Sequence, residues 1–432
     1  MKVNISGNNA QSIFESVREL TQSGDLPAGA LLPPVRELAD TLGVNRNTVS
    51  SAYQRLAKAG IAITQGRLGT RICQLTDAGE QEGMTDTALY DLADGSPNRD
   101  WLPDLNQVAS RTQFQQYLYG ENTLLPGLAE FGQQWFARCC PGDFEIVLSN
   151  GAIDAMERLM AAHLLPGDTV LVEQPCYISS ANAIRLAGMK LSGVQIDRFG
   201  MQTEALRAAL AKGARAVIIT PRAHNPTGAC LSAERAQALQ VVLAEYPNVL
   251  VMVDDHFALM AESEYHSVIP ATTQNWAIFR SVSKGFGPDL RLAIIAADKD
   301  TVARFNTRLA PGMSWVSRVL QAMVLTCLTD QAVQDKLADT KLQCARQRNF
   351  LLDALAAYGV ACPMTIDGLN VWVPVTGNSQ AAAYELSRKG WLVRPGTSFD
   401  INQESQGLRV SIPNLEQDIA QRFARDLANI RY

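Results

Sequence analysis

A lysine in the stretch SVSKGFGPDLRLAI, residues 281–294, has neighbours suited to covalent chemistry on a ligand that carries a phosphate. A lysine amine forms a Schiff base with an aldehyde only after losing its proton, and burial favours that loss because it penalises the charged form. Lys284 follows the apolar run AIFRSV, so it emerges from the edge of a core. Ser281 and Ser283 are short hydroxyl donors, and Arg291 can neutralise a phosphate dianion. A lysine beside serines is more often an ordinary surface residue. Whether Lys284 belongs to a binding site therefore depends on other segments of the sequence.

Four other segments place suitable side chains for a pyridine ring with a phosphate. Asp254 ends VMVDD, where a carboxylate can keep a pyridine nitrogen protonated. Asn225 in AHNPTGA can bond a ring hydroxyl, and Tyr177 in EQPCYIS can stack on a ring. Gly151 and Ala152 in LSNGAIDAMERL open a helix whose N–H groups suit a phosphate. Taken singly, each has an ordinary interpretation as a helix cap, a turn, a core ring or a bare helix start.

Apolar runs and helical stretches alternate from Tyr90 onward, which predicts the elements that hold these residues. DTVLVEQP, ARAVIITP, NVLVMVDD and AIFRSVSK have the length and composition of strands covered on both faces. AERAQALQVVLAEY is one of the helical stretches between them. The alternation predicts a large α/β domain over residues 90–432 with a mainly parallel sheet. GFGPDL is not GxGxxG, so it carries no dinucleotide signal.

Residues 1–73 predict a small α+β winged helix-turn-helix domain. Apolar residues recur at helical spacing in three stretches, namely Ile13, Val17 and Leu20, then Leu38 and Leu42, then Val49, Ala52, Tyr53 and Leu56. Pro33 and Pro34 can start the second helix, Gly43 ends it, and Asn45 is a good cap for the third. The segment 61–72 is predicted to form a strand, a turn and a second strand, and this hairpin would be the wing of the domain.

Polar residues crowd the first turn of the predicted third helix, where a recognition helix meets the major groove. Arg46 can bond a guanine or a phosphate with its two-pronged guanidinium, and Thr48 can reach a phosphate or a thymine methyl. The candidate DNA contacts are Arg36, Arg46, Asn47, Thr48, Gly66 and Arg67. The alternative is a small helical domain with a solvated basic face.

Charge is distributed unevenly along the 432 residues. The net charge is −5, but residues 1–73 hold eight Lys or Arg and five Asp or Glu, so the first domain is positive and the remainder negative. A small basic domain suits contact with a polyanion. The polar, acidic segment 74–89 is predicted to be a linker.

Cysteine use and the first residues indicate a cytoplasmic protein. The eight cysteines include no CxxC pair and no metal spacing, so we expect reduced thiols and no metal site. MKVNISGNNAQS is polar and is not a signal peptide, and no apolar run approaches the ~18 residues of a membrane span.

The first domain resembles the GntR family of regulators in LPPVRELADTLGVNRNTVSSAYQRLAKAG and QGRLGTRI. The resemblance implies that Arg36, Arg46, Thr48 and Gly66 contact DNA. The family usually has serine where this chain has Pro34, a modest departure.

The second domain resembles the fold-type I pyridoxal-phosphate enzymes over nearly all of residues 91–432. The order SNGAID, EQPCY, HNPTG, VDD, SVSK and a late arginine in GLRVSI carries the likeness. It implies that pyridoxal 5′-phosphate bonds covalently to Lys284. The other implied roles are the pyridine nitrogen for Asp254, the ring hydroxyl for Asn225, stacking for Tyr177, the phosphate for Gly151, Ala152, Ser281 and Arg291, and a substrate carboxylate, if there is one, for Arg409.

Three departures from the enzyme pattern indicate a site that keeps the cofactor and has relaxed its catalysis. His256 stands where the family often has tyrosine, and it either replaces the phenol or simply packs. Ile153 stands where glutamine is common, and YLYGENTLLPGLAEF lacks the aromatic residue and the arginine that usually follow its YG.

The two domains together resemble the MocR subfamily of GntR regulators. The resemblance implies a homodimeric DNA-binding repressor whose aminotransferase-like domain senses pyridoxal phosphate or an adduct of it. Within this subfamily, the compact polar linker and the divergent second domain indicate vitamin B6 metabolism genes as the expected targets. Two alternatives stay open: a working aminotransferase with an added DNA-binding domain, and a dimerisation scaffold without cofactor.

Overall fold

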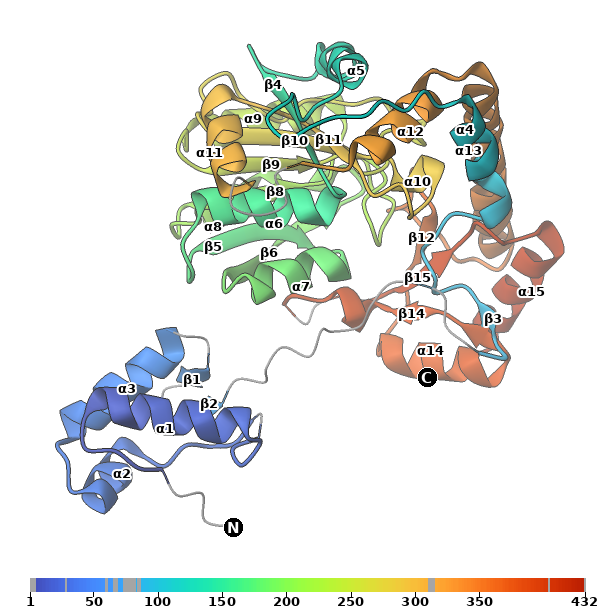
Figure 1. The fold of residues 1–432 in the computed structure, drawn as a ribbon. Helices are drawn as coiled ribbons and strands as arrows, with labels where there is room; N and C mark the ends of the chain where they lie inside the picture. Colours follow the sequence, from blue (N-terminus) through green and yellow to red (C-terminus); the bar gives the residue numbers. More distant parts are fainter. Residues whose placement is uncertain are drawn as a thin grey trace. The chain divides into compact units, whose positions relative to one another are not determined.

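The computed structural model divides the chain into two compact units, Met1–Gly79 and Glu80–Tyr432 (Figure 1). It describes residues 5–27, 29–58, 61–64, 69–72, 83, 87–309, 315–402 and 405–430. The division falls within the segment that we predict to be a linker, and each unit has its own hydrophobic core.

The first unit contains three helices followed by a two-stranded antiparallel sheet. The elements are α1 (Ala10–Gln22), α2 (Val35–Leu42), α3 (Arg46–Lys58), β1 (Ala62–Thr64) and β2 (Thr70–Ile72). This order confirms the winged helix-turn-helix fold. The residues 65–68 at the tip of the wing lie outside the described residues.

Local sequence signals explain the turn of the helix-turn-helix. Gly43 ends α2 with a φ of 65°, a left-handed conformation that glycine adopts without strain. Asn45 then accepts a hydrogen bond from the backbone N–H of Asn47 at 2.8 Å, as expected of a residue that caps α3. Pro34 lies at the cap of α2, so this helix begins one residue after the proline pair. The predicted apolar stripe of α3 is buried in the core of the unit.

The second unit is built on an eight-stranded sheet. Its order is β4 (Glu145–Ser149), β11 (Ala293–Ala297), β10 (Trp276–Ser281), β9 (Leu250–Asp254), β8 (Ala216–Ile219), β5 (Thr169–Gln174), β6 (Lys190–Asp197) and β7 (Gly200–Met201). The four strands predicted from the apolar runs are the neighbours β10, β9, β8 and β5, and all run parallel. Strand β11 is antiparallel to both of its neighbours, and β7 is antiparallel to β6. The other four pairings are parallel, which confirms the predicted mainly parallel sheet.

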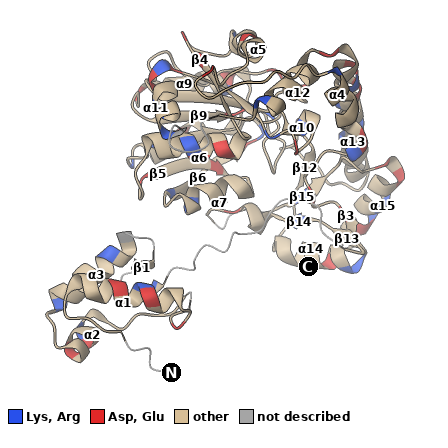
Figure 2. Ribbon diagram, in the orientation of Figure 1, with Lys and Arg blue, Asp and Glu red and all other residues tan. Residues whose placement is uncertain are grey.

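Helices cover both faces of this sheet (Figure 1). Ile218 and Met252 belong to one buried cluster and Ile219 and Val253 to another, because successive side chains of a strand point to opposite faces. The strands are mostly without charged residues (Figure 2). The first cluster holds residues of α6 (Ala152–His163), α7 (Ile178–Leu186) and α11 (Lys299–Leu309), and the second holds residues of α5 (Pro126–Phe136), α8 (Thr203–Leu210) and α9 (Ala233–Ala244).

A smaller part of the second unit contains strands from both the beginning and the end of that unit. Its strands are β12 (Asn370–Val373), β15 (Leu408–Ser411) and β14 (Arg394–Pro395) in one sheet, and β3 (Tyr90–Asp91) beside β13 (Trp391–Leu392). The other α-helices among the described residues of this unit are α4 (Leu105–Arg111), α10 (Ser283–Phe286), α12 (Arg318–Thr329), α13 (Gln331–Ala357), α14 (Ser379–Arg388) and α15 (Gln417–Ala428). Pairing of β3 with β13 brings the segment after residue 91 next to β15.

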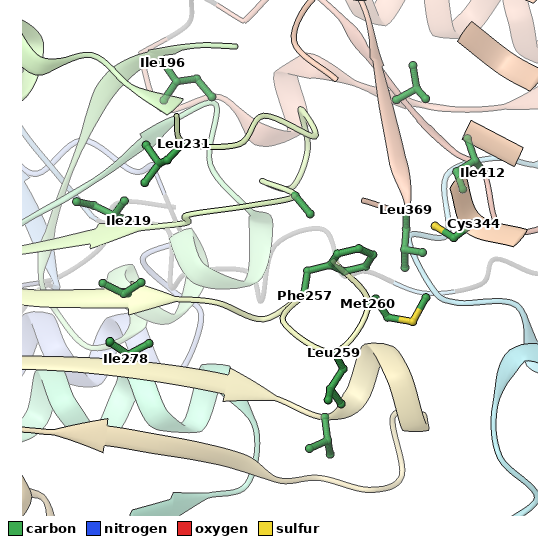
Figure 3. Packing of buried hydrophobic residues seen from close by; sticks show 14 of the residues in the cluster. Ile196, Ile219, Leu231, Phe257, Leu259, Met260, Ile278, Cys344, Leu369 and Ile412 are labelled. Carbon is green, nitrogen blue, oxygen red and sulfur yellow. The ribbon is translucent and has the colours of Figure 1, made fainter. Parts of the chain in front are cut away.

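The core of the second unit runs from the sheet into this smaller part (Figure 3). Phe257, Leu259 and Met260, which follow β9, belong to the same buried cluster as Ile278 on the sheet and Leu369 near β12. The loop that follows β9 therefore packs against both the large sheet and the smaller part of the unit. The polar residues at the end of β9 therefore have a rigid support.

No helix in the described part of the chain has the length and apolar character needed to cross a membrane. The cysteines at positions 139, 140, 176, 230, 327, 344 and 362 are free thiols. Among the described residues, no group of three or more histidine, cysteine and acidic side chains is placed to hold a metal ion.

Candidate cofactor site and DNA-contact residues

A cavity of about 730 Å³ lies where the parallel strands end. This volume suits a cofactor-sized ligand, and the carboxyl edge of a parallel sheet is where α/β proteins bind ligands. The structure brings all but one of the residues predicted to contact the cofactor ring and phosphate to its wall, namely Ala152, Tyr177, Asn225, Asp254, His256, Ser281, Lys284 and Arg291. Gly151 is the cap of α6 and directly precedes Ala152 in the chain.

Lys284 lies in α10, the short helix that follows β10. Its Nζ donates a hydrogen bond to the carbonyl oxygen of Gly95 at 2.9 Å, and the amine lies at the cavity. The hydroxyls of Ser281 and Ser283 are 2.9 Å apart beside it. The lysine amine and the hydroxyl pair are therefore positioned together, as the sequence predicts.

The start of α6 and Arg291 form an anion-binding end of the cavity. Gly151 occupies the cap position with a φ of 101°, and because glycine has no side chain, no side chain of the cap residue occupies the helix N–H groups. Backbone N–H groups at a helix start favour an anion. A Cβ atom at Gly151 would lie 2.7 Å from Nη2 of Arg291. The glycine is thus what allows the guanidinium to lie over the helix start.

Gly151→Ala should weaken binding of pyridoxal phosphate by about tenfold, or ~1.4 kcal/mol, while the protein stays folded. The added methyl group displaces Arg291 and strains the backbone at positive φ. Titration of the protein with cofactor, followed by absorbance, measures the effect. Gly142→Ala is the control, because a Cβ atom there meets nothing within 4 Å; equal losses in both variants would contradict the account.

Asp254 presents an unsatisfied carboxylate oxygen in the cavity. The residue is 9% exposed, and its Oδ1 is buried without a hydrogen-bond partner among the described residues. The imidazole of His256 lies beside it, with Nδ1 3.7 Å from that oxygen, and burial lowers the pKa of His256 to about 4, so the ring is neutral at pH 7. Burial, and then the charge of Asp255, raise the pKa of Asp254 to about 7. A protonated pyridine nitrogen would supply the missing donor, so this residue fits the cofactor.

Two arginines bind the carboxylate of Asp255. Its carboxylate is fully buried and accepts hydrogen bonds from Nε of Arg222 and from Nε of Arg280, each at 2.8 Å. Buried charges are stable when paired in this way. The adjacent aspartates therefore differ in their contacts: Asp255 is paired within the protein, whereas Asp254 lines the cavity with an Oδ1 that has no hydrogen-bond partner among the described residues.

Glu173 and His224 extend the polar floor of the cavity, and the sequence analysis did not single them out. Glu173, at the end of β5, accepts a hydrogen bond from the N–H of Thr220 at 3.0 Å and lies 3.4 Å from Nε2 of His224. Nδ1 of His224 is 2.8 Å from the hydroxyl of Thr227. Burial raises the pKa of Glu173 to about 8 and lowers that of His224 to about 3. At neutral pH this floor holds a neutral histidine beside a mostly protonated glutamic acid.

The cofactor-free protein should lose stability as pH rises from 6.5 to 8.5. Asp254 and Glu173 have pKa values above their ordinary ones, so the folded state holds more protons than the unfolded state and its stability falls as they ionise. His224 and His256 have lowered pKa values in the folded state, so they make stability rise with pH only while the unfolded chain still protonates them, up to about pH 6.5. The double variant Asp254→Asn, Glu173→Gln should flatten the slope of the thermal midpoint in this window. An unchanged slope would contradict these two assignments.

Arg409 is completely buried and binds protein oxygens. Its Nη1 donates to Oδ1 of Asn225 at 3.1 Å and its Nη2 donates to the carbonyl oxygen of Ala93. Its guanidinium lies 5.0 Å from the ring centre of Phe399. It is not among the residues that line the cavity. Since Oδ1 of Asn225 accepts from Arg409, the amide nitrogen of Asn225 is the group that could donate to a ring hydroxyl. The predicted roles of Asn225 with a ring hydroxyl and of Arg409 with a carboxylate stay predictions.

The predicted DNA contacts lie on the helix-turn-helix of the first unit. Arg36, Arg46 and Asn47 are exposed and Thr48 is half-buried. The last three form the first turn of α3, and α3 carries basic but no acidic residues (Figure 2). Gly66 and Arg67, predicted at the wing, lie outside the described residues.

Known families match both units. Residues 9–72 match the bacterial regulatory proteins of the gntR family, and residues 99–427 match aminotransferase class I and II. The structure also resembles that of an archaeal alanine:glyoxylate aminotransferase, with a TM-score of 0.71 and 21% identity over 95% of this chain and 97% of that one. The chain therefore belongs to the transcriptional regulators that join a GntR-type domain to an aminotransferase class I and II domain, as the sequence motifs predict.

Within this class, the chain is 48% identical to the vitamin B6 salvage pathway transcriptional repressor PtsJ of Salmonella typhimurium, over 98% of each chain. It is 24% identical to the probable rhizopine catabolism regulatory protein MocR of Rhizobium meliloti, over 83% of this chain and 79% of that protein. The assignment to the MocR subfamily is thus confirmed.

Proposed function

We propose that the protein is a repressor of vitamin B6 salvage genes whose aminotransferase-like domain binds pyridoxal 5′-phosphate as its effector. The observation that carries this proposal is the unsatisfied Oδ1 of Asp254, in a cavity that also contains Lys284 and Arg291. A buried acceptor without a donor costs about 1–3 kcal/mol, so the protein gains when a ligand supplies the donor. The likeness to PtsJ supports the choice of target genes.

In this proposal, different residues of the cavity bind different parts of the cofactor. Pyridoxal phosphate supplies an aldehyde for a lysine amine and a pyridine ring that acts as an electron sink. In this proposal Lys284 holds the aldehyde carbon, Asp254 bonds the pyridine nitrogen and the amide of Asn225 donates to the ring hydroxyl. Tyr177 stacks on the ring and His256 packs beside Asp254. The phosphate lies against Gly151, Ala152, Ser281 and Arg291.

The helix-turn-helix reads the operator. Arg46 and Asn47 face base edges in the major groove, and Arg36 and Thr48 bond backbone phosphates. A homodimer presents two recognition helices to two half-sites, and such a regulator acts in the cytoplasm. Cofactor changes DNA affinity only if it binds one arrangement of the domains better than another.

Footprinting on the control regions of vitamin B6 salvage genes tests the proposed function. The purified protein should protect one region containing two half-sites, and the protein concentration needed for protection should change when pyridoxal phosphate is added. Protection elsewhere in the genome but not at these genes would overturn the choice of targets. Protection that is identical with and without cofactor would overturn the effector role.

A further inference from the structure

Two adjacent thiols, Cys139 and Cys140, follow α5, and the proposed function does not use them. Both are partly exposed, and neither lines the cofactor cavity. Their backbone N–H groups donate to the carbonyl oxygen of Phe136 at 2.8 and 3.3 Å, so the turn that carries them is held to the helix. The sulfur of Cys139 accepts a hydrogen bond from Nη2 of Arg280 at 3.1 Å. A partly exposed thiol beside a cation is the environment in which cysteines react.

Arg280 has positive charge to spare for this sulfur. It is 2% exposed, and it shares the single carboxylate of Asp255 with Arg222. Two guanidinium groups therefore face one carboxylate. Nη1 of Arg280 donates to the carbonyl oxygen of Trp135 at 2.6 Å, which leaves Nη2 directed at Cys139. An anion on the sulfur, or on an atom added to it, would gain a charge-assisted hydrogen bond.

The hydroxyl of Tyr265 is a second donor at this place. It is buried without a hydrogen-bond partner among the described residues, and the ring centre lies 5.4 Å from Cζ of Arg280. Burial, and then the charges of Asp255 and Cys139, raise the pKa of Tyr265, so this hydroxyl keeps its proton close to the thiol. A buried donor without an acceptor is costly. An oxygen atom added to the sulfur would supply the acceptor.

Cys140 and Cys362 are also partly exposed, and they differ from Cys139 in their environment. Burial raises the pKa of each to about 12, so both remain protonated thiols at neutral pH. Cys140 is also poorly placed to form a disulfide with its neighbour. The Cα atoms of adjacent residues joined by a trans peptide bond lie about 3.8 Å apart, whereas a disulfide usually needs roughly 4.4 Å or more. Oxidation at Cys139 therefore stops at the single sulfur.

We propose that Cys139 is a peroxide-sensitive thiol whose sulfenic acid is stabilised by Arg280 and Tyr265. The ionised sulfur attacks one oxygen of hydrogen peroxide, so that an S–O bond forms as the O–O bond breaks. The hydroxide that leaves takes up the proton released by the thiol and becomes water. Sulfur is oxidised by two electrons and the peroxide is reduced by the same two. This site lies outside the cofactor cavity, so the inference goes beyond the proposed function and does not depend on it.

Trapping of the sulfenic acid tests the proposal on the full-length protein. Hydrogen peroxide is added together with dimedone, which reacts with sulfenic acids, and the labelled peptides are quantified by mass spectrometry. Labelling at Cys139 should exceed that at Cys362 by at least about tenfold. Tyr265→Phe keeps the ring and removes only the hydroxyl, so it should lower labelling at Cys139 by about threefold or more.

Serine variants assign the label between the two adjacent thiols. Cys139→Ser should abolish labelling of the peptide that holds both, and Cys140→Ser should leave it unchanged; the thermal midpoint of each variant checks that it is folded. Equal labelling of Cys139 and Cys362, labelling that survives in Cys139→Ser, or labelling that Tyr265→Phe does not lower would each overturn the proposal. The cofactor and DNA assays above decide the proposed function separately.

Discussion

Replacing Lys284 by alanine is expected to remove the absorbance band of the lysine-bound cofactor and to weaken cofactor binding by about 100-fold or more, ~3 kcal/mol. The covalent bond to Nζ is lost, while Asp254, Asn225 and Arg291 retain their polar contacts. The side chain is at the cavity wall and not in the core, so the protein should fold normally. Absorbance titration with pyridoxal phosphate measures both effects.

Lys190→Ala is the control for this variant, because Lys190 is an exposed lysine at the start of β6. It should bind cofactor as the wild-type protein does. A Lys284→Ala protein that keeps the absorbance band would show that another amine holds the cofactor. That result would remove Lys284 from the account.

Replacing Arg46 by alanine is expected to weaken operator binding by about 5- to 150-fold, the range of a lost arginine–guanine contact. Arg46 is exposed in the first turn of α3, so the change should not affect folding. If the side chain bonds a base, the loss should be larger for the operator than for unrelated DNA. If it bonds a phosphate, the loss should be uniform and the slope of affinity against salt should fall by about one.

Arg18→Ala serves as the control on the same domain. Arg18 lies in α1 and pairs with Glu15 at 2.7 Å. Its removal lowers the positive charge of the domain by the same amount without touching the recognition helix. Equal losses of DNA affinity in the two variants would show that only overall charge matters.

The sequence predicts the strands that end at the cavity because each is an apolar run followed by a polar residue. Asp254 and Lys284 could be located in this way, since the carboxyl ends of neighbouring parallel strands meet at one edge. The resemblance to known families supplied the roles of Asn225 and Tyr177, which the local sequence leaves open. The turn before α3 could likewise be predicted from local sequence, because Gly43 is a typical residue at the end of a helix and Asn45 a typical cap at the start of the next.

Glu173 could not be located from local patterns. It lies in the stretch EQPCYIS, whose spacing does not indicate burial. Its burial results from tertiary packing, and its carboxylate accepts a hydrogen bond from the N–H of Thr220, the residue after β8. Whether a carboxylate has a partner is a property of the folded chain.

The most direct test of the account is the affinity of the protein for its own upstream DNA, measured by fluorescence anisotropy with and without pyridoxal phosphate. Salt must be fixed, because phosphate contacts make the affinity strongly salt-dependent. The account predicts that cofactor shifts the affinity of the wild-type protein and leaves that of Lys284→Ala unchanged. Identical affinities in all four conditions would contradict it, and an assay of turnover would then separate a working aminotransferase from a scaffold that has lost its function.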